Sequence, residues 1–204
     1  MSGMDKDTVW RYIHAERRAL AGHLATLDAE QWEHDSLCAG WTVRDVAAHV
    51  ISTPQIGWRE VLRMTPLMLK GYHRAIFEVT KELGKAPVDD ILAQYERYDG
   101  STHHVPTTTH VEPLIDALVH TQDVLRPLGI EHEMPAEAAA FAADRAWLLF
   151  APVFGTGIPR RGLRLVATDT DWTRGRGDRV VEAPMQELLM FVTGRSAARV
   201  SVPQ

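Results

Sequence analysis

One helix-forming segment constrains the fold of this chain most, because it is apolar around most of its circumference. Residues 111–128 carry leucine, isoleucine and valine at helical spacing, with Pro113 in the expected first turn and Gly129 just after the expected end. Asp116 and His120 lie four residues apart, and therefore on one face of this helix. A helix of this kind packs among other helices, so both polar side chains are expected to require a partner in the interior.

A histidine far upstream, His49, is the natural partner. It lies within a turn of Val46 and Val50, which places it on the inward face of a second predicted helix. Two imidazoles and one carboxylate make a three-ligand zinc set that leaves one position open for chemistry. His49, Asp116 and His120 therefore predict a catalytic metal site. Two simpler interpretations stay open at this point: a hydrogen-bonded core histidine, and a side-chain hydrogen bond along one helix.

Three other groups of residues were weighed for chemistry. Asp123 is interpreted as a surface carboxylate or as one that holds an imidazole in one tautomer. Cys38 is interpreted as a packing residue rather than a nucleophile. His103, His104 and His110 fall in a polar loop and are expected to be solvated.

Composition and charge exclude several classes of partner. The 204 residues are 45% hydrophobic and 24% charged, with a net charge of -5, which is typical of a globular protein and gives no basic footprint for nucleic acid. Cys38 is the single cysteine, so no internal disulfide can form. We see neither a targeting segment nor an apolar run of membrane-spanning length. The expectation is a cytoplasmic protein without a nucleic-acid or membrane partner, either monomer or homodimer.

Helical patterns fill the first three quarters of the chain, and the character changes near residue 155. Residues 155–162 read as a turn-rich linker, followed by alternating strand patterns at 163–168 and 179–182 that could form a hairpin. A helix at 185–192 follows. We therefore predict an α+β, mainly α fold, with a helical metal-binding domain at 1–154 and a small α/β domain at 155–204 packed on it.

The stretch Ser36-Leu-Cys-Ala-Gly-Trp-Thr-Val-Arg-Asp-Val-Ala-Ala-His49 resembles the signature of the mycothiol-dependent maleylpyruvate isomerase-like family, within the DinB superfamily. Two further blocks resemble this family: residues 116–129, and the C-terminal segment from Arg164 to Arg195. The resemblance implies a DinB-like four-helix bundle followed by a tail similar to part of a sterol-carrier-like domain. It also implies a divalent metal, usually zinc, held by His49, Asp116 and His120.

The resemblance further implies an enzyme that uses a low-molecular-weight thiol, mycothiol, as cosubstrate. The metal-bound thiolate would attack a small electrophile, in an isomerisation or an S-transfer. Asp116 stands where the family usually has Glu, and Thr121-Gln122 replaces a bulkier pair, so a differently shaped pocket is expected. Arg195 is a candidate for binding a substrate anion, or a cation at a helix C-terminus. The alternatives are a non-catalytic module of the same fold and a thiol-independent zinc hydrolase.

Overall fold

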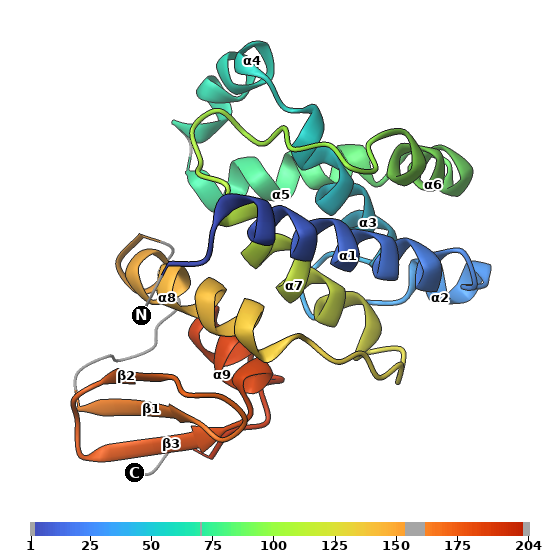
Figure 1. The fold of residues 1–204 in the computed structure, drawn as a ribbon. Coiled ribbons are helices and arrows are strands. Elements are labelled where there is room, and N and C mark those ends of the chain that lie inside the picture. Colours follow the sequence, from blue (N-terminus) through green and yellow to red (C-terminus); the bar gives the residue numbers. More distant parts are fainter. Residues whose placement is uncertain (1–2, 70, 154–161, 202–204) are drawn as a thin grey trace. The chain divides into compact units, whose positions relative to one another are not determined.

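The computed structural model describes residues 3–69, 71–153 and 162–201, which belong to two compact units. The first unit is Asp5–Glu131, and the second comprises His132–Gln204 with Met1–Met4. Helices dominate, and one small three-stranded sheet lies in the second unit, which confirms the predicted α+β, mainly α class (Figure 1). The predicted domain boundary after residue 154, and most of the predicted linker, lie outside the described residues.

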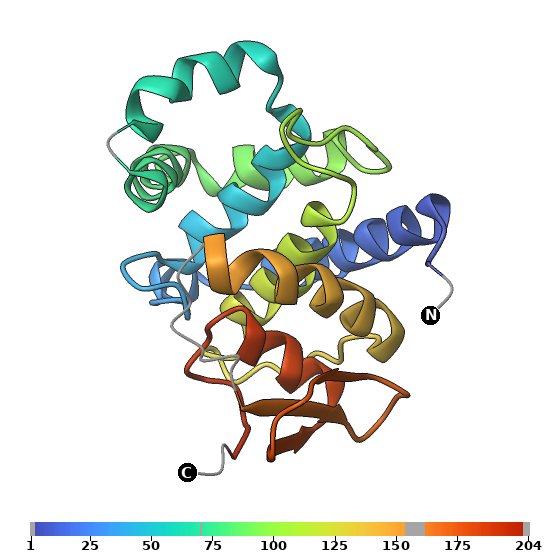
Figure 2. The same ribbon diagram turned by 90° about the vertical axis from the view of Figure 1, so that its left-hand side faces the viewer.

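The first unit is built on four helices that contact one another in a ring. Helix α1 packs on α7, α7 on α3, α3 on α6, and α6 on α1, as the two ribbon views show (Figures 1 and 2). The elements of this unit are α1 (Lys6–Leu24), α2 (Ala29–Glu33), α3 (Val43–Ser52), the 3-10 turn η1 (Thr53–Gln55), α4 (Trp58–Met68), α5 (Tyr72–Leu83), α6 (Val88–Arg97) and α7 (Glu112–Leu125). Apolar side chains that are almost fully buried fill much of the interior, among them Leu20, Leu24, Val43, Val46, Val50, Ile91, Val124 and Leu125.

Helix α7 begins within one residue of the predicted start and ends at Leu125, three residues before the predicted end. Pro113 occupies its first turn, where the missing N–H has no helical partner to lose. After Leu125 the chain closes through Gly129, whose φ is +70°. The amide of Ile130 donates to the carbonyl of Leu125 at 3.0 Å, and that of Gly129 donates to Arg126 at 3.0 Å. This pair of bonds is a Schellman closure, and it satisfies carbonyls that the helix end would leave without a donor.

Pro66 lies inside helix α4 and does not end it. The chain instead turns between α4 and α5 at Gly71, whose φ is +122°. No residue of α4 is buried, so water can satisfy the carbonyl that the proline ring leaves without an N–H donor.

The second unit pairs two helices and a sheet. Helix α8 (Ala136–Val153) packs on α9 (Met185–Val192), although the sequence pattern had grouped α8 with the bundle. Strands β1 (Leu163–Ala167), β2 (Thr173–Gly175) and β3 (Arg179–Ala183) form a sheet of order β2-β1-β3. The indole N–H of Trp172 donates to Asp144 on α8 at 2.7 Å, which ties the strand connection to that helix.

The predicted hairpin between the first and last strand patterns is wrong, because β1 and β3 are parallel. The antiparallel partner of β1 is the short strand β2, which the sequence pattern did not reveal. Between β2 and β3 the chain passes from one side of β1 to the other, and it crosses the first residue of β1, Leu163, at Gly177. There the amide of Gly177 donates to Leu163 at 3.2 Å, and the amide of Arg179 donates to Gly162 at 3.0 Å.

Gly177→Ala is expected to destabilise the fold by about 2 kcal/mol or more, because the new Cβ would overlap the backbone carbonyl of Gly162. Thermal unfolding measures the loss. The matched control is Gly22→Ala in the exposed part of α1, where a Cβ meets nothing within 4 Å and the helix gains about 0.5–1 kcal/mol. Equal melting temperatures for the two variants would contradict this account of the crossing.

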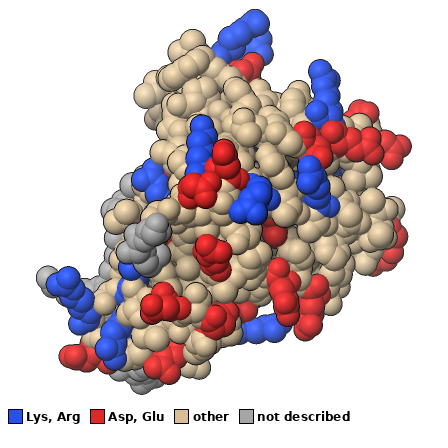
Figure 3. Space-filling view, in the orientation of Figure 1, with Lys and Arg blue, Asp and Glu red and all other residues tan. Residues whose placement is uncertain are grey.

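The surface carries charges of both signs. On the face drawn in Figure 3, Lys and Arg side chains are interspersed with Asp and Glu, which accords with the modest net charge of -5. Among the described residues, the structure contains no helix with the length and apolar character needed to cross a bilayer.

Candidate metal centre

Helix α3, which carries His49, starts at a tightly capped turn. Gly40 takes a φ of +79°, and Thr42 then accepts a hydrogen bond from the amide of Asp45 at 3.3 Å. The Asp45 carboxylate accepts from the amide of Thr42 at 2.9 Å, so the two residues form a capping box. Lys81 on α5 donates to the same carboxylate at 2.5 Å, which joins α5 to the start of α3. This cap sets the register that brings His49 to the inner face.

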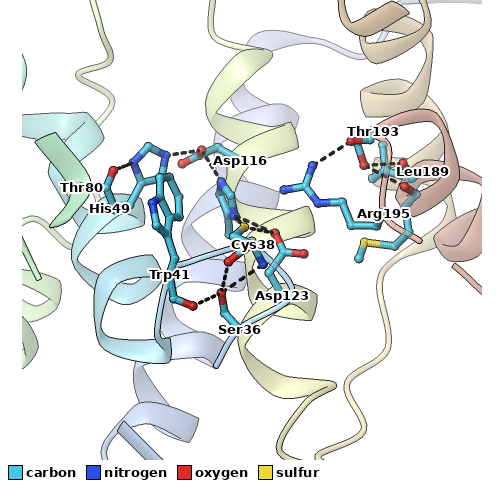
Figure 4. A network of polar contacts seen from close by, with 12 residues as sticks. Ser36, Cys38, Trp41, His49, Thr80, Asp116, Asp123, Leu189, Thr193 and Arg195 are labelled. Carbon is cyan, nitrogen blue, oxygen red and sulfur yellow. Dashed lines mark hydrogen bonds and ion pairs between the residues drawn. The ribbon is translucent and has the colours of Figure 1, made fainter. Parts of the chain in front are cut away.

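The structure brings together the three residues that the sequence predicts as metal ligands. Figure 4 shows two of them, His49 and Asp116, facing each other. The Nε2 atom of His49 lies 3.3 Å from Oδ1 of Asp116, and the Nε2 atom of His120 lies 3.4 Å from the same oxygen. The three side chains are only 12–19% exposed. Helices α3 and α7 thus place two imidazole nitrogens and one carboxylate oxygen at a single point.

The other nitrogen of each imidazole has a partner of its own. Nδ1 of His49 lies 3.2 Å from the hydroxyl of Thr80 on α5, and Nδ1 of His120 lies 2.8 Å from Oδ2 of Asp123. A proton on each Nδ1 satisfies these contacts and leaves both Nε2 lone pairs directed toward Asp116. Asp123 therefore has the tautomer-holding position that the sequence suggested, whereas nothing in the sequence spacing pointed to Thr80.

The residues fit a bound divalent metal. Oδ2 of Asp116 is buried without a hydrogen-bond partner, which is costly for a carboxylate oxygen. The distances of 3.3 and 3.4 Å exceed those of good charge-assisted hydrogen bonds. They match the separation of about 3.3 Å between two ligand atoms that each lie ~2.0–2.1 Å from a tetrahedral zinc. Nitrogen and carboxylate ligands in this number leave a coordination position open.

Electrostatics keeps the carboxylate ionised. Burial alone would raise the pKa of Asp116, but the nearby imidazoles of His49 and His120 hold that pKa well below its usual range. Burial would also lower the pKa of His120, yet Cys38, Asp116 and Asp123 together raise it well above the ordinary value. Without a metal, the cluster therefore compensates its negative charge with protons on imidazole.

Trp41 and Arg17 complete the surroundings of the cluster. The Trp41 ring is buried, and its centroid lies 5.2 Å from that of His49 and 6.2 Å from that of His120. Arg17 on α1 is also buried, and its Nη2 donates to the hydroxyl of Thr53 at 2.7 Å. Burial lowers the pKa of Arg17, and the negative charge of Asp116 raises it. The sequence pattern singled out neither residue for this position.

Cys38, interpreted from the sequence as a packing residue, contacts this cluster: its Sγ lies 3.2 Å from Oδ2 of Asp123 and 3.7 Å from Nδ1 of His120. Arg195 follows α9 in the second unit, where its Nη1 donates to the carbonyl of Thr193 at 2.9 Å. His103 and His104 lie in the loop before α7, and Nδ1 of His104 contacts the hydroxyl of Thr108 at 3.3 Å. The role of Arg195 as an anion-binding residue stays a prediction.

Residues 13–97 match the family model described as the mycothiol maleylpyruvate isomerase N-terminal domain. This part of the chain is therefore similar to the N-terminal domain of this family. The match confirms the resemblance seen in the sequence, and it includes His49, Trp41 and Thr80. Asp116 and His120 follow on α7, beyond the matched residues, and the fold returns them to His49.

Two solved structures have the same fold. The crystal structure of the mycothiol-dependent maleylpyruvate isomerase is 15% identical, with a TM-score of 0.67 over 99% of this chain and 95% of that chain. A histidine-to-alanine variant of that enzyme is 14% identical, with a TM-score of 0.66 and the same coverage. A search of curated protein sequences gave no match. At these identities the likeness establishes the fold of the family.

Proposed function

We propose that this chain is a metal-dependent enzyme that uses a low-molecular-weight thiol, mycothiol in its natural setting, either to isomerise a small electrophile or to transfer the thiol sulfur to it. The observation that carries the proposal is the convergence of His49, Asp116 and His120 on one point, next to a family domain whose namesake depends on mycothiol. Asp116 is one methylene shorter than the usual Glu, and its Oδ1 still lies 3.3 and 3.4 Å from the two imidazoles. The shorter side chain of Asp116 therefore still reaches the two imidazoles.

The residues of the chain would act as follows. Nε2 of His49, Nε2 of His120 and the Asp116 carboxylate would hold the metal, with zinc the first choice for nitrogen and oxygen ligands. A bound divalent ion lowers the pKa of a thiol that reaches its open position, so that the thiol ionises near neutral pH. Thr80 and Asp123 keep a proton on each Nδ1 and so present the Nε2 lone pairs. Trp41 covers one side of both imidazoles and excludes water there.

Several finer expectations belong to the same proposal. The ring of α1, α7, α3 and α6 is interpreted as a DinB-like four-helix bundle, and the C-terminal α/β part as related to a sterol-carrier-like domain. A cytoplasmic location and a monomeric or homodimeric state are proposed with it.

A thiol-dependence assay tests the proposed function. The protein is stripped with a chelator and reloaded with zinc. It is then mixed with a model maleyl electrophile and either mycothiol or no thiol. We expect loss of the electrophile only when zinc and thiol are both present, and no loss with His49→Ala. Turnover without thiol would favour a zinc hydrolase instead, and ligand binding without turnover would favour a non-catalytic module.

Thr80→Val is expected to weaken zinc binding roughly 10-fold, because it removes the oxygen that orients His49 while keeping the shape of the side chain. Thr80 is buried, and its substitution by valine keeps the packing volume. Competition with a fluorescent zinc chelator measures the affinity. Thr80→Ser, which keeps the hydroxyl, should retain the wild-type affinity, and equal weakening in both variants would contradict the orienting role.

A further inference from the structure

A second cluster of metal-ligand atoms lies on the opposite side of the His120 ring. Oδ2 of Asp123 lies 2.8 Å from Nδ1 of His120 and 3.2 Å from Sγ of Cys38, and Sγ lies 3.7 Å from the same Nδ1. Around a tetrahedral metal with one sulfur ligand, such atoms lie roughly 3.3–3.5 Å apart. The three donors therefore need to move only by tenths of an ångström to share one ion.

Backbone hydrogen bonds hold Cys38 and Asp123 next to each other. Pro127 has no N–H, so it cannot satisfy the carbonyl of Asp123 as the next helical turn normally would. The amide of Leu37 donates to that carbonyl at 3.0 Å, which fastens the loop before α3 to α7. The amide of Cys38 in turn donates to Oγ of Ser36 at 3.1 Å. Asp123 itself is completely buried, so the thiol is held against a rigid carboxylate.

The geometry points to a second metal seat, formed by Cys38, Asp123 and Nδ1 of His120, that takes thiophilic ions such as Cd²⁺ in competition with the first seat. The first set offers nitrogen and oxygen only, whereas this set includes a sulfur ligand, which soft metals prefer. His120 belongs to both sets through opposite ring nitrogens, which point away from each other and cannot ligate one ion together.

The proton balance explains why the two seats compete. Cys38 loses its Sγ–H proton to solvent when the ion binds. The Nδ1 atom of neutral His120 becomes a ligand, so the ring proton resides on Nε2, which then faces Oδ1 of Asp116 as a donor. The ring is then no longer a ligand of the first seat. The competition rests on the proposed function, but the second seat itself does not.

Cadmium titration of the metal-stripped protein tests the seat, with the ultraviolet thiolate-to-cadmium charge-transfer band as readout. Cys38 is the single cysteine, so any such band reports it. We expect a band that saturates at about one ion per chain, remains in His49→Ala, and vanishes in Cys38→Ser. Asp123→Asn should weaken cadmium binding at least ~10-fold, with its fold checked by circular dichroism. No band in the wild type, or unchanged affinity in Asp123→Asn, overturns the seat.

A second measurement tests the competition. Zinc-loaded protein is treated with one equivalent of Cd²⁺, dialysed, and analysed for both metals. We expect the wild type to lose zinc as the thiolate band grows, and Cys38→Ser to lose less than a fifth as much. A full thiolate band with zinc retained would overturn the competition while leaving the seat in place. If the double variant His49→Ala/Cys38→Ser still binds zinc at wild-type affinity, the proposed first seat fails, and the cadmium band still tests the second seat.

Discussion

Replacing either imidazole of the candidate metal centre is expected to abolish stoichiometric zinc binding while the helical fold survives. His49→Ala, made together with Cys38→Ser so that the second seat is also closed, removes the ligand on α3, and His120→Ala removes one on α7, so two ligands of the first set remain in each variant. Two ligands hold zinc far more weakly than three, and occupancy should fall from about one ion per chain to less than a tenth of that. Inductively coupled plasma mass spectrometry measures the number of zinc ions per chain. The protein should be untagged and purified without a nickel column.

The carboxylate position supplies the matched control. Asp116→Ala should lose the ion, while Asp116→Glu, which restores the residue usual in the family, should keep it. Circular dichroism confirms that each variant is folded. Full zinc occupancy in both histidine variants would show that the ion binds elsewhere. A wild type that binds no zinc even when zinc is added would leave the non-catalytic module as the better interpretation.

Leu20→Ala is expected to lower the free energy of unfolding by about 2–5 kcal/mol, because Leu20 is fully buried and its truncation leaves a cavity in the helical core. Leu20 lies on α1, which carries none of the three proposed ligands, so zinc stoichiometry should stay unchanged in protein that remains folded. Urea unfolding, followed by tryptophan fluorescence, measures the difference.

The exposed leucine Leu62 on α4 provides the comparison. Its side chain is 69% exposed, so Leu62→Ala should change stability by less than about 0.5 kcal/mol. A loss in Leu20→Ala that is no larger than in Leu62→Ala would mean that α1 does not pack as described.

Residue spacing predicts the parts of this protein that depend on neighbours in the chain. The capping box of Thr42 and Asp45, the proline start of α7 and its closure at Gly129 follow from short-range hydrogen bonding, and all are present. The Asp116–His120 pair on one helix face follows from the helical repeat. Residue spacing does not predict which strands pair when the pairing depends on one chain segment crossing another. The parallel pairing of β1 with β3 depends on Gly177 passing the backbone of Gly162, a contact that no alternation pattern contains.

Residue spacing shows which helix faces carry polar side chains, and so which side chains can meet inside the fold. His49, Asp116 and His120 stood out because each is a polar group on an apolar face, where burial requires a partner. The packing of the helices, and not spacing along the chain, brings Thr80 to the imidazole of His49 and Cys38 to that of His120. These two contacts join residues 31 and 82 positions apart. Spacing sets the direction of a side chain on its own helix, but the distance between helices is set by how their cores pack.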